Sequence, residues 1–326
     1  MYRGYSLQTK RSGKSYHRGA AGSLVSKSDP SGVNLIMEKQ RVALIGLGLM
    51  GEGMAARLLA AKFPLTIYNR NREKAAPFEK SGAVIAASPR DAAAHADVVL
   101  VIVSDDAASR AIWLGENGAL AGAAPGSVLV DSSTLSVTWV KELAAAAVAR
   151  QCELLDAPVL GSKPQAAAGE LRFLVGGSAP ALERSRPVLA VMGKEAIHLG
   201  PTGSGAMLKL INNFMCGVQA ASLAEATALI TRSDLDREKA LGVLMSGAPA
   251  SPLVKTLNTR ASAGDFTPNF VLRLMAKDLK YAGEEGTQRH LKMQTAAAAL
   301  AVFQQAIASG YGEMDFSAIV ESVQKA

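Results

Sequence analysis

The chain has 326 residues, of which 49% are hydrophobic and 19% are charged. This length and composition predict a soluble globular protein with a core large enough for two domains. Only Cys152 and Cys216 are present, which excludes a disulfide-rich scaffold and favours a reducing compartment. We find neither an apolar run of about 18 residues nor a secretory signal, so no membrane is expected as a partner.

The net charge of +7 is concentrated at the N-terminus. Residues 1–36 contain six lysines and arginines and a single acid, Asp29, and therefore carry +5 of this total. The remainder lacks the strong basicity that is typical of nucleic-acid-binding proteins, so nucleic acid is not expected as a partner.

We predict that residues 1–38 form a disordered basic extension, because they are rich in Ser, Gly, Lys and Arg and have almost no apolar periodicity. An upstream start with the true start at Met37, a mitochondrial or plastid transit peptide, and a functional basic tail are the three interpretations. The composition fits a transit peptide, but no amphipathic helical face is found. The expected location is the cytoplasm.

Residues 42–58 read VALIGLGLMGEGMAARL, a strand-like run that enters a G-x-G-x-x-G spacing and then becomes helical. In this setting the first glycine permits the tight turn, the second lets a pyrophosphate approach the backbone, and the third lets the helix pack closely on the strand. Unpaired N–H groups of the loop would face the phosphates. The predicted cofactor contacts here are Gly46, Leu47, Gly48, Leu49, Met50 and Gly51.

Short apolar runs alternate with helical stretches from residue 41 to about residue 200. This alternation predicts an α/β fold, a doubly wound Rossmann domain over 39–200 with a parallel sheet and the cofactor at the carboxyl ends of the strands. The expected strands are 42–45, 65–68, 84–86, 98–103, 128–130, 153–157, 173–175 and 196–199.

Beyond Thr202 no strand-like run remains, so we predict an all-α domain over 201–326 that is joined to the first domain by a long helix. The expected helices are 206–231, 236–246, 252–261, 271–285, 293–309 and 316–324.

The second expected strand ends in Asn69, Arg70, Asn71 and Arg72. An NAD site needs an acidic side chain here for the ribose 2′-hydroxyl, whereas a 2′-phosphate needs a neutral donor and a guanidinium. Because no acid is present, the sequence favours NADP(H), bound through Asn69, Arg70 and Asn71.

The long helix carries Lys209 and, four residues later, Asn213. This spacing places both side chains on one face of the helix. Helical spacing alone is also satisfied by an exposed lysine, so the chemistry of this pair depends on further motifs.

Four separated motifs resemble those of the β-hydroxyacid dehydrogenases, which include 3-hydroxyisobutyrate dehydrogenase, tartronate semialdehyde reductase and glyoxylate/succinic semialdehyde reductase. The resemblance covers about residues 40–325. The motifs are the glycine loop 44–55, Asp131-Ser132-Ser133-Thr134, the segment 156–169 that begins Asp-Ala-Pro-Val-Leu-Gly-Ser-Lys, and Gly205–Asn213, followed by Phe270 and Lys277-Asp278-Leu279.

The resemblance implies a role for each motif. Lys209 is the implied catalytic residue with Asn213 as its neighbour, and Thr134 lies by the cofactor together with Val103. Lys277 approaches the nicotinamide end of the cofactor. The implied substrate-binding residues are Leu160, Gly161, Ser162, Phe270 and Asp278.

One departure concerns the substrate segment. Family members usually have Ser where this chain has Leu160, and that Ser helps to hold the substrate carboxylate. The N–H groups of Gly161 and Ser162 could still receive a carboxylate, but the lost hydroxyl indicates a larger or less polar acid.

The resemblance to the glyoxylate/succinic semialdehyde reductase branch extends to Asn69-Arg70-Asn71 and Gly161-Ser162-Lys163. It implies NADPH-dependent reduction of a small aldehyde acid, with Lys209 as proton donor, by a homodimer or homotetramer whose helical domain supplies the interface. No metal site is expected, because the four histidines are scattered.

Three alternatives are an NAD-dependent 3-hydroxyisobutyrate-type dehydrogenase, an imine reductase, and a non-catalytic module for NADP binding or oligomerisation. Lys209 counts against the last two, because those relatives generally lack this lysine.

Overall fold

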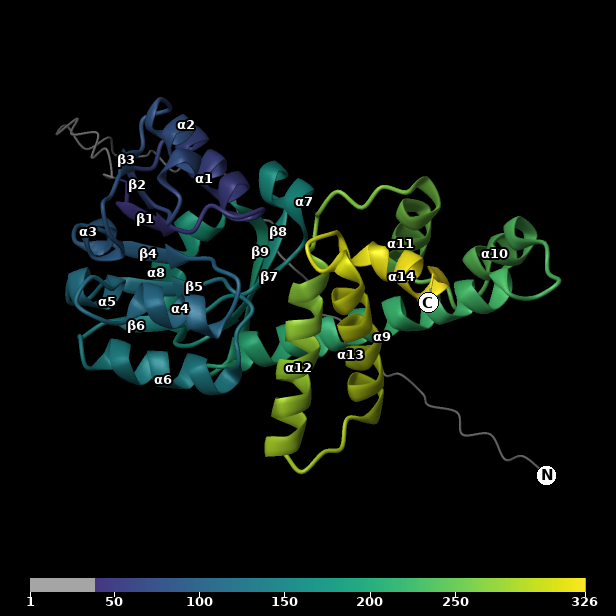
Figure 1. Cartoon of the computed structure of the whole chain (residues 1–326). Helices are drawn as coiled ribbons and strands as arrows, with labels where there is room; N and C mark the ends of the chain where they lie inside the picture. The colour runs from purple at the N-terminus through teal and green to yellow at the C-terminus, as the bar shows by residue number, and fades with distance from the viewer. Residues whose placement is uncertain (1–38, 326) are drawn as a thin grey trace, which may run out of the picture. The chain divides into compact units, whose positions relative to one another are not determined.

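The computed structural model describes residues 39–325, so the extension expected over 1–38 lies outside the described residues. Within this range an α/β half is followed by a helical half, as Figure 1 shows. This arrangement confirms the predicted fold class, a Rossmann domain followed by an all-α domain.

The described residues form a nine-stranded sheet in the order β3-β2-β1-β4-β5-β6-β8-β7, with β9 paired to β8. The strands are β1 Val42–Ile45, β2 Leu65–Tyr68, β3 Val84–Ile85, β4 Val98–Val101, β5 Val128–Asp131, β6 Glu153–Asp156, β7 Val159–Leu160, β8 Leu171–Gly176 and β9 Gly193–Gly200.

The strands in the series β3-β2-β1-β4-β5-β6 are parallel to one another, and the strand order reverses between β1 and β4. In β1, Val42 and Leu44 join the core on one face of the sheet, whereas Ala43 and Ile45 join the core on the other. Both faces are covered by helices, which is why this strand is an unbroken apolar run. The reversal places the loops after β1 and β4 side by side at one edge, where open α/β sheets bind ligands.

The remaining strands differ from the expected all-parallel sheet. Strand β8 is antiparallel to both β6 and β7, while β9 is parallel to β8. Strand β7 was not expected at all, because its two residues are too short to give a periodic signal.

The helices of the α/β half are α1 Gly51–Ala60, η1 Arg72–Lys74, α2 Ala76–Glu79, α3 Pro89–Ala93, α4 Asp106–Trp113, α5 Ala119–Gly122, α6 Val137–Val148, α7 Lys163–Ala168 and α8 Ala179–Leu189. Helices α1 and α8 contribute to one face, and α4 and α6 contribute to the other.

The helical half consists of α9 Ser204–Thr231, α10 Arg237–Ser246, α11 Pro252–Ala263, α12 Leu272–Gln288, α13 Gln294–Ala306, η2 Ile307–Tyr311, η3 Phe316–Ala318 and α14 Ile319–Lys325. Helix α9 packs against α12, α13 and α14 and also against β8 (Figure 1). The core shared by these helices includes Ala220, Leu279, Phe303 and Ile319.

Helix α9 is long and apolar enough to cross a membrane by length and composition, and no other described helix is. The same properties suit the central helix of a helical domain, which is the place that α9 occupies.

The carboxylate of Asp156 anchors the start of α9 to the sheet. It accepts hydrogen bonds from the N–H groups of Gly203 at 2.7 Å and Ala206 at 2.8 Å. A helix N-terminus leaves such N–H groups without helical partners, so a carboxylate there satisfies them. The end of β6 thereby fixes the origin of the helix that carries Lys209.

Candidate active site

The loop after β1 has the geometry of a phosphate cradle. Gly46 has φ +107°, and a Cβ there would lie 2.1 Å from the carbonyl oxygen of Ile102. A Cβ on Gly51 would lie 2.0 Å from the carbonyl oxygen of Gly46, whereas one on Gly48 would meet nothing within 4 Å. The first and third glycines are therefore required by close packing, and the second faces open space where a pyrophosphate can approach.

Leu47, Leu49 and Met50 complete this loop. Within residues 39–325, no hydrogen bond is formed by the N–H groups of Gly48, Leu49 and Met50, and Met50 gives α1 no side-chain cap. Leu47 is buried and donates its N–H to Oδ1 of Asn69 at 2.9 Å. The unpaired N–H groups at the start of α1 fit the phosphates of a dinucleotide.

Asn69 lies at the end of β2, between the loop and the expected ribose site. Its Nδ2 donates to the carbonyl oxygen of Asn71 at 2.7 Å, and Oδ1 of Asn71 accepts from the N–H of Glu73. Arg70 is exposed, and within the described residues it forms no hydrogen bond or ion pair. The asparagines thus shape the turn and leave the Arg70 guanidinium available to an anion.

The loops after β4 and β5 are joined to each other. The N–H of Val103 donates to Oγ of Ser133 at 2.8 Å. Asp131 holds Ser133 in turn, because its buried carboxylate accepts from the N–H of Ser133 and from Nε1 of Trp113. Burial raises the pKa of Asp131, and hydrogen bonds from Ser133 and Trp113 oppose that rise. Val103 and Thr134 therefore lie on a fixed edge of the sheet.

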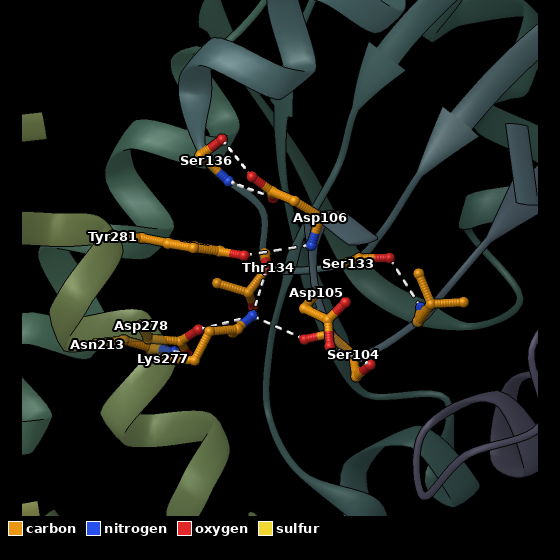
Figure 2. Close-up of polar contacts among 11 residues, drawn as sticks. Ser104, Asp105, Asp106, Ser133, Thr134, Ser136, Asn213, Lys277, Asp278 and Tyr281 are labelled. Atoms are coloured by element: carbon orange, nitrogen blue, oxygen red, sulfur yellow. Dashed lines mark hydrogen bonds and ion pairs between the residues drawn. The ribbon is translucent and has the colours of Figure 1, made fainter. Parts of the chain in front are cut away.

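Lys277 on α12 binds both of these loops. Its ammonium donates to the carbonyl oxygens of Ser104 at 2.8 Å and Thr134 at 2.5 Å. It also lies 3.0 Å from Oδ1 of Asp278 (Figure 2). The structure therefore brings Lys277 to Thr134, beside which the resemblance implies the nicotinamide end of the cofactor.

Lys209 is half-buried on α9. Burial lowers the pKa of its ammonium, and the negative charge of Asp278 acts in the opposite direction. Within residues 39–325, no side chain or carbonyl forms a hydrogen bond or ion pair with this ammonium. Lys209 thus has donors to offer to a ligand.

Asn213, four residues after Lys209 on α9, and Asp278 on α12 are both buried. Nδ2 of Asn213 donates to Oδ2 of Asp278 at 2.6 Å, and Oδ1 of Asn213 accepts from Nδ2 of Asn212 at 2.9 Å. Both the nitrogen and the oxygen of the Asn213 side-chain amide therefore have hydrogen-bond partners. Asp278, which the resemblance assigned to the substrate, directs its carboxylate toward Asn213 and Lys277.

The segment after β7 presents Leu160, Gly161 and Ser162. Leu160 is half-buried, and Gly161 has φ +118°, which turns the chain into α7. Both the N–H and the Oγ of Ser162 donate to Oε1 of Gln165, at 2.9 and 2.8 Å. Because this capping interaction occupies the Ser162 N–H, that group is not free for a substrate carboxylate as the structure stands.

Phe270 lies just before α12, at the edge of the helical core. Its ring packs edge-on against Phe316 with the centroids 5.5 Å apart, and its N–H donates to the buried carboxylate of Asp315 at 3.1 Å. Among the described residues, no hydrogen bond or ring contact joins Phe270 to Lys209 or Lys277.

Two contacts between the domains were missed by sequence reasoning. On α12, the hydroxyl of Tyr281 accepts from the N–H of Asp106 at 3.3 Å, and Oε1 of Glu285 accepts from the N–H of Val137 at 3.2 Å. Their spacing from Lys277, four and eight residues, places all three on one helix face and was the available signal.

The residues that the structure describes contain no cluster of three or more His, Cys, Asp or Glu side chains that could hold a metal ion.

Comparisons with known proteins cover both domains. Residues 41–200 match the family model for the NAD binding domain of 6-phosphogluconate dehydrogenase. Residues 203–323 match the model described as NAD-binding of NADP-dependent 3-hydroxyisobutyrate dehydrogenase.

Curated relatives match along nearly their full length. The NAD-dependent L-serine dehydrogenase of Pseudomonas aeruginosa is 34% identical over 86% of this chain and 96% of its own. Glyoxylate/succinic semialdehyde reductase 1 of Arabidopsis thaliana is 30% identical over 87% and 98%. Among solved structures, a 3-hydroxyisobutyrate dehydrogenase from Salmonella typhimurium has a TM-score of 0.79 with 31% identity over 87% of this chain and 99% of that chain.

Proposed function

Because this chain belongs to the β-hydroxyacid dehydrogenase family, we propose that it is an NADPH-dependent oxidoreductase that reduces a small aldehyde acid to the hydroxy acid. The substrate class is that of glyoxylate or succinic semialdehyde. The family consists of NAD(P)-dependent hydroxyacid dehydrogenases, and the choice of NADPH and of the aldehyde acid is the part we propose.

The observation that carries this function is the half-buried ammonium of Lys209, which has no hydrogen-bond or ion-pair partner within residues 39–325. Asp278, whose charge acts on Lys209, forms an ion pair with Lys277. Lys277 in turn binds the carbonyl oxygens of Ser104 and Thr134. Because Asn213, four residues after Lys209, donates to Asp278, α9 is connected to the edge of the sheet where the dinucleotide would bind.

A dinucleotide fits the cradle formed by Gly46, Gly48 and the start of α1, and when bound it supplies the hydride. The Lys209 ammonium donates a hydrogen bond to the carbonyl oxygen of the aldehyde and delivers a proton as negative charge develops there. General acid catalysis of this kind contributes about 10²–10⁴-fold. Partial burial strengthens the interaction and lowers the pKa of Lys209, which eases proton transfer.

The choice of NADPH is supported by the end of β2. Asn69 is neutral and uses its amide on Leu47 and Asn71, so no carboxylate there repels a 2′-phosphate. The exposed Arg70 guanidinium supplies a positive charge with donors in a planar fork, which suits a phosphate.

A second candidate is an NAD-dependent dehydrogenase of the 3-hydroxyisobutyrate type that acts in the oxidising direction. The similarity to the NAD-dependent L-serine dehydrogenase favours it. Initial rates with NADH and NADPH, measured side by side in both directions, distinguish the two candidates.

The test of the proposed chemistry uses two substitutions of Lys209. Lys209→Met removes the proton donor, so we expect NADPH oxidation with glyoxylate or succinic semialdehyde to fall at least about 100-fold while NADPH affinity stays nearly unchanged. Lys209→Arg keeps the positive charge but not a transferable proton, and should be almost as slow. Lys280→Ala, on an exposed position of α12, is the control. Turnover retained in Lys209→Met refutes the role.

A further inference from the structure

Helix α12 presents a polar stripe to the α/β domain. Lys277, Tyr281 and Glu285 follow one another at intervals of four residues, so their side chains lie on one face. Each bonds a backbone group of the other domain: the carbonyl oxygen of Ser104, the N–H of Asp106 and the N–H of Val137, respectively. The stripe therefore contacts the segments that follow β4 and β5.

Tyr281, at the middle of this stripe, makes two different contacts. Its hydroxyl oxygen accepts the N–H of Asp106 at 3.3 Å. Its ring lies below the Lys277 ammonium, with 5.1 Å between Nζ and the ring centroid, a distance typical of a cation–π interaction. Tyr281 thus contacts both the loop after β4 and the lysine that binds it.

Asp106 extends this contact to the second loop. Its carboxylate accepts the N–H of Ser136 at 2.9 Å and the Oγ of Ser136 at 2.6 Å. Ser136 lies two residues after Thr134, whose carbonyl oxygen Lys277 binds. Figure 2 shows the contact of Tyr281 with Asp106 and that of Lys277 with Thr134.

The Tyr281 hydroxyl has a raised pKa. Burial raises this pKa to about 12, with the nearby carboxylates of Asp106 and Asp105 adding to the rise. The oxygen that accepts the Asp106 N–H is therefore neutral near pH 7.

We infer that Tyr281 is a positioning residue for the nicotinamide end of the cofactor. It acts through Asp106 and Lys277 by holding the two loops, after β4 and after β5, at a fixed distance from α12. This role rests on the proposed function in that the loops carry Val103 and Thr134, the predicted contacts of the cofactor.

The test compares two variants of Tyr281. Tyr281→Phe removes only the hydroxyl, so NADPH affinity should weaken by about two- to ten-fold, the usual effect of one lost hydrogen bond. Tyr281→Leu also removes the ring below Lys277, and should weaken it by about a further two- to five-fold. NADPH fluorescence titration measures both. Lys280→Ala is the matched control, since Lys280 lies exposed on the same helix.

A double-mutant cycle tests whether Tyr281 acts through Lys277. If it does, the additional loss on going from Phe to Leu at position 281 should largely vanish in a Lys277→Met background. Full additivity of the two losses would instead show that the ring and the ammonium act independently, and would overturn this part of the inference.

Amide hydrogen exchange supplies a readout that does not depend on turnover. The amide hydrogen of Asp106 should exchange faster in Tyr281→Phe than in the wild type, and its exchange rate should be unchanged in Lys280→Ala. If the wild type reduces no aldehyde acid, the proposed function fails while the exchange and titration data still decide the role of Tyr281. Unchanged exchange at Asp106 together with unchanged NADPH affinity in both Tyr281 variants overturns the inference.

Discussion

Asn213 donates a 2.6 Å hydrogen bond to the carboxylate of Asp278, and both side chains are buried. The bond joins α9, which carries Lys209, to α12, which carries Lys277. The same carboxylate lies 3.0 Å from the Lys277 ammonium and opposes the burial that lowers the pKa of Lys209. Asp278 is therefore the ion-pair partner of Lys277, and its negative charge also acts on Lys209.

Asp278→Asn should change the pH dependence of reduction. The negative charge of Asp278 favours the ammonium form of Lys209, so its removal lowers the pKa of Lys209 further. Because the proton donor must be protonated, kcat should decline from a lower pH in the variant than in the wild type. A pH–rate profile measures this shift, and an alkaline limb at the wild-type position would contradict the shared role.

Asn69→Asp should reverse the cofactor preference toward NADH. The new carboxylate would repel a 2′-phosphate and could accept hydrogen bonds from a 2′-hydroxyl. Arg70→Ala should weaken NADPH about ten- to hundred-fold, the effect of losing a charge-assisted bond, and leave NADH nearly unaffected. The ratio of kcat/KM for the two cofactors tests both variants. An unchanged NADPH preference in Asn69→Asp would remove the basis for assigning NADP(H).

Leu160→Ser should shift the substrate range toward short acids. It restores the hydroxyl that related proteins are expected to use on the substrate carboxylate, at a half-buried position beside Gly161. In a panel of C2 to C5 aldehyde acids at fixed NADPH, we expect KM for glyoxylate to fall several-fold and kcat to change less, because the added bond is made in the ground state as well. If the wild type and the variant rank the panel identically, Leu160 does not set substrate choice.

Asp156 should make the stability of the fold depend on pH. Burial raises its pKa from 3.8 to about 6, although the N–H groups of Gly203 and Ala206 lower it. Between about pH 4 and 6 the folded protein retains a proton that the unfolded chain has released, so the free energy of unfolding falls as the pH rises. The loss from this group is roughly 3 kcal/mol, because two pKa units correspond to that amount.

Asp156→Asn does not titrate and is the comparison for this prediction. Urea unfolding at several values of pH should show a steeper decline between about pH 4 and 6 for the wild type than for the variant. Parallel curves would show that the Asp156 carboxyl has the same proton affinity in both states.

The sequence was sufficient for much of the α/β half. Apolar runs over 42–45 and 65–68 gave the bounds of β1 and β2, since these strands are flanked by glycine or proline. An apolar run looks the same whether its strand is parallel or antiparallel to its neighbours. The sequence therefore could not predict that β8 is antiparallel to β6 and β7. The two-residue strand β7 had no periodicity to detect.

The sequence predicts a set of site residues but not the contacts between them. Helical spacing placed Asn213 beside Lys209, yet nothing in it shows that Asn213 contacts Asp278, 65 residues later. The contacts of Lys277 are with carbonyl oxygens, which every residue has and no motif marks. Asp156 lies in the predicted substrate segment, but its carboxylate holds the start of α9 through backbone N–H groups. Backbone groups carry no sequence motif, so this contact could not be predicted either.

Helix α1 and helix α7 touch through their backbones, because a Cβ on Gly53 would lie 2.7 Å from the carbonyl carbon of Ala166. The seat of the pyrophosphate and the segment that follows Leu160 are therefore parts of one rigid block. A shift of either segment relative to the other would therefore have to separate these two backbones.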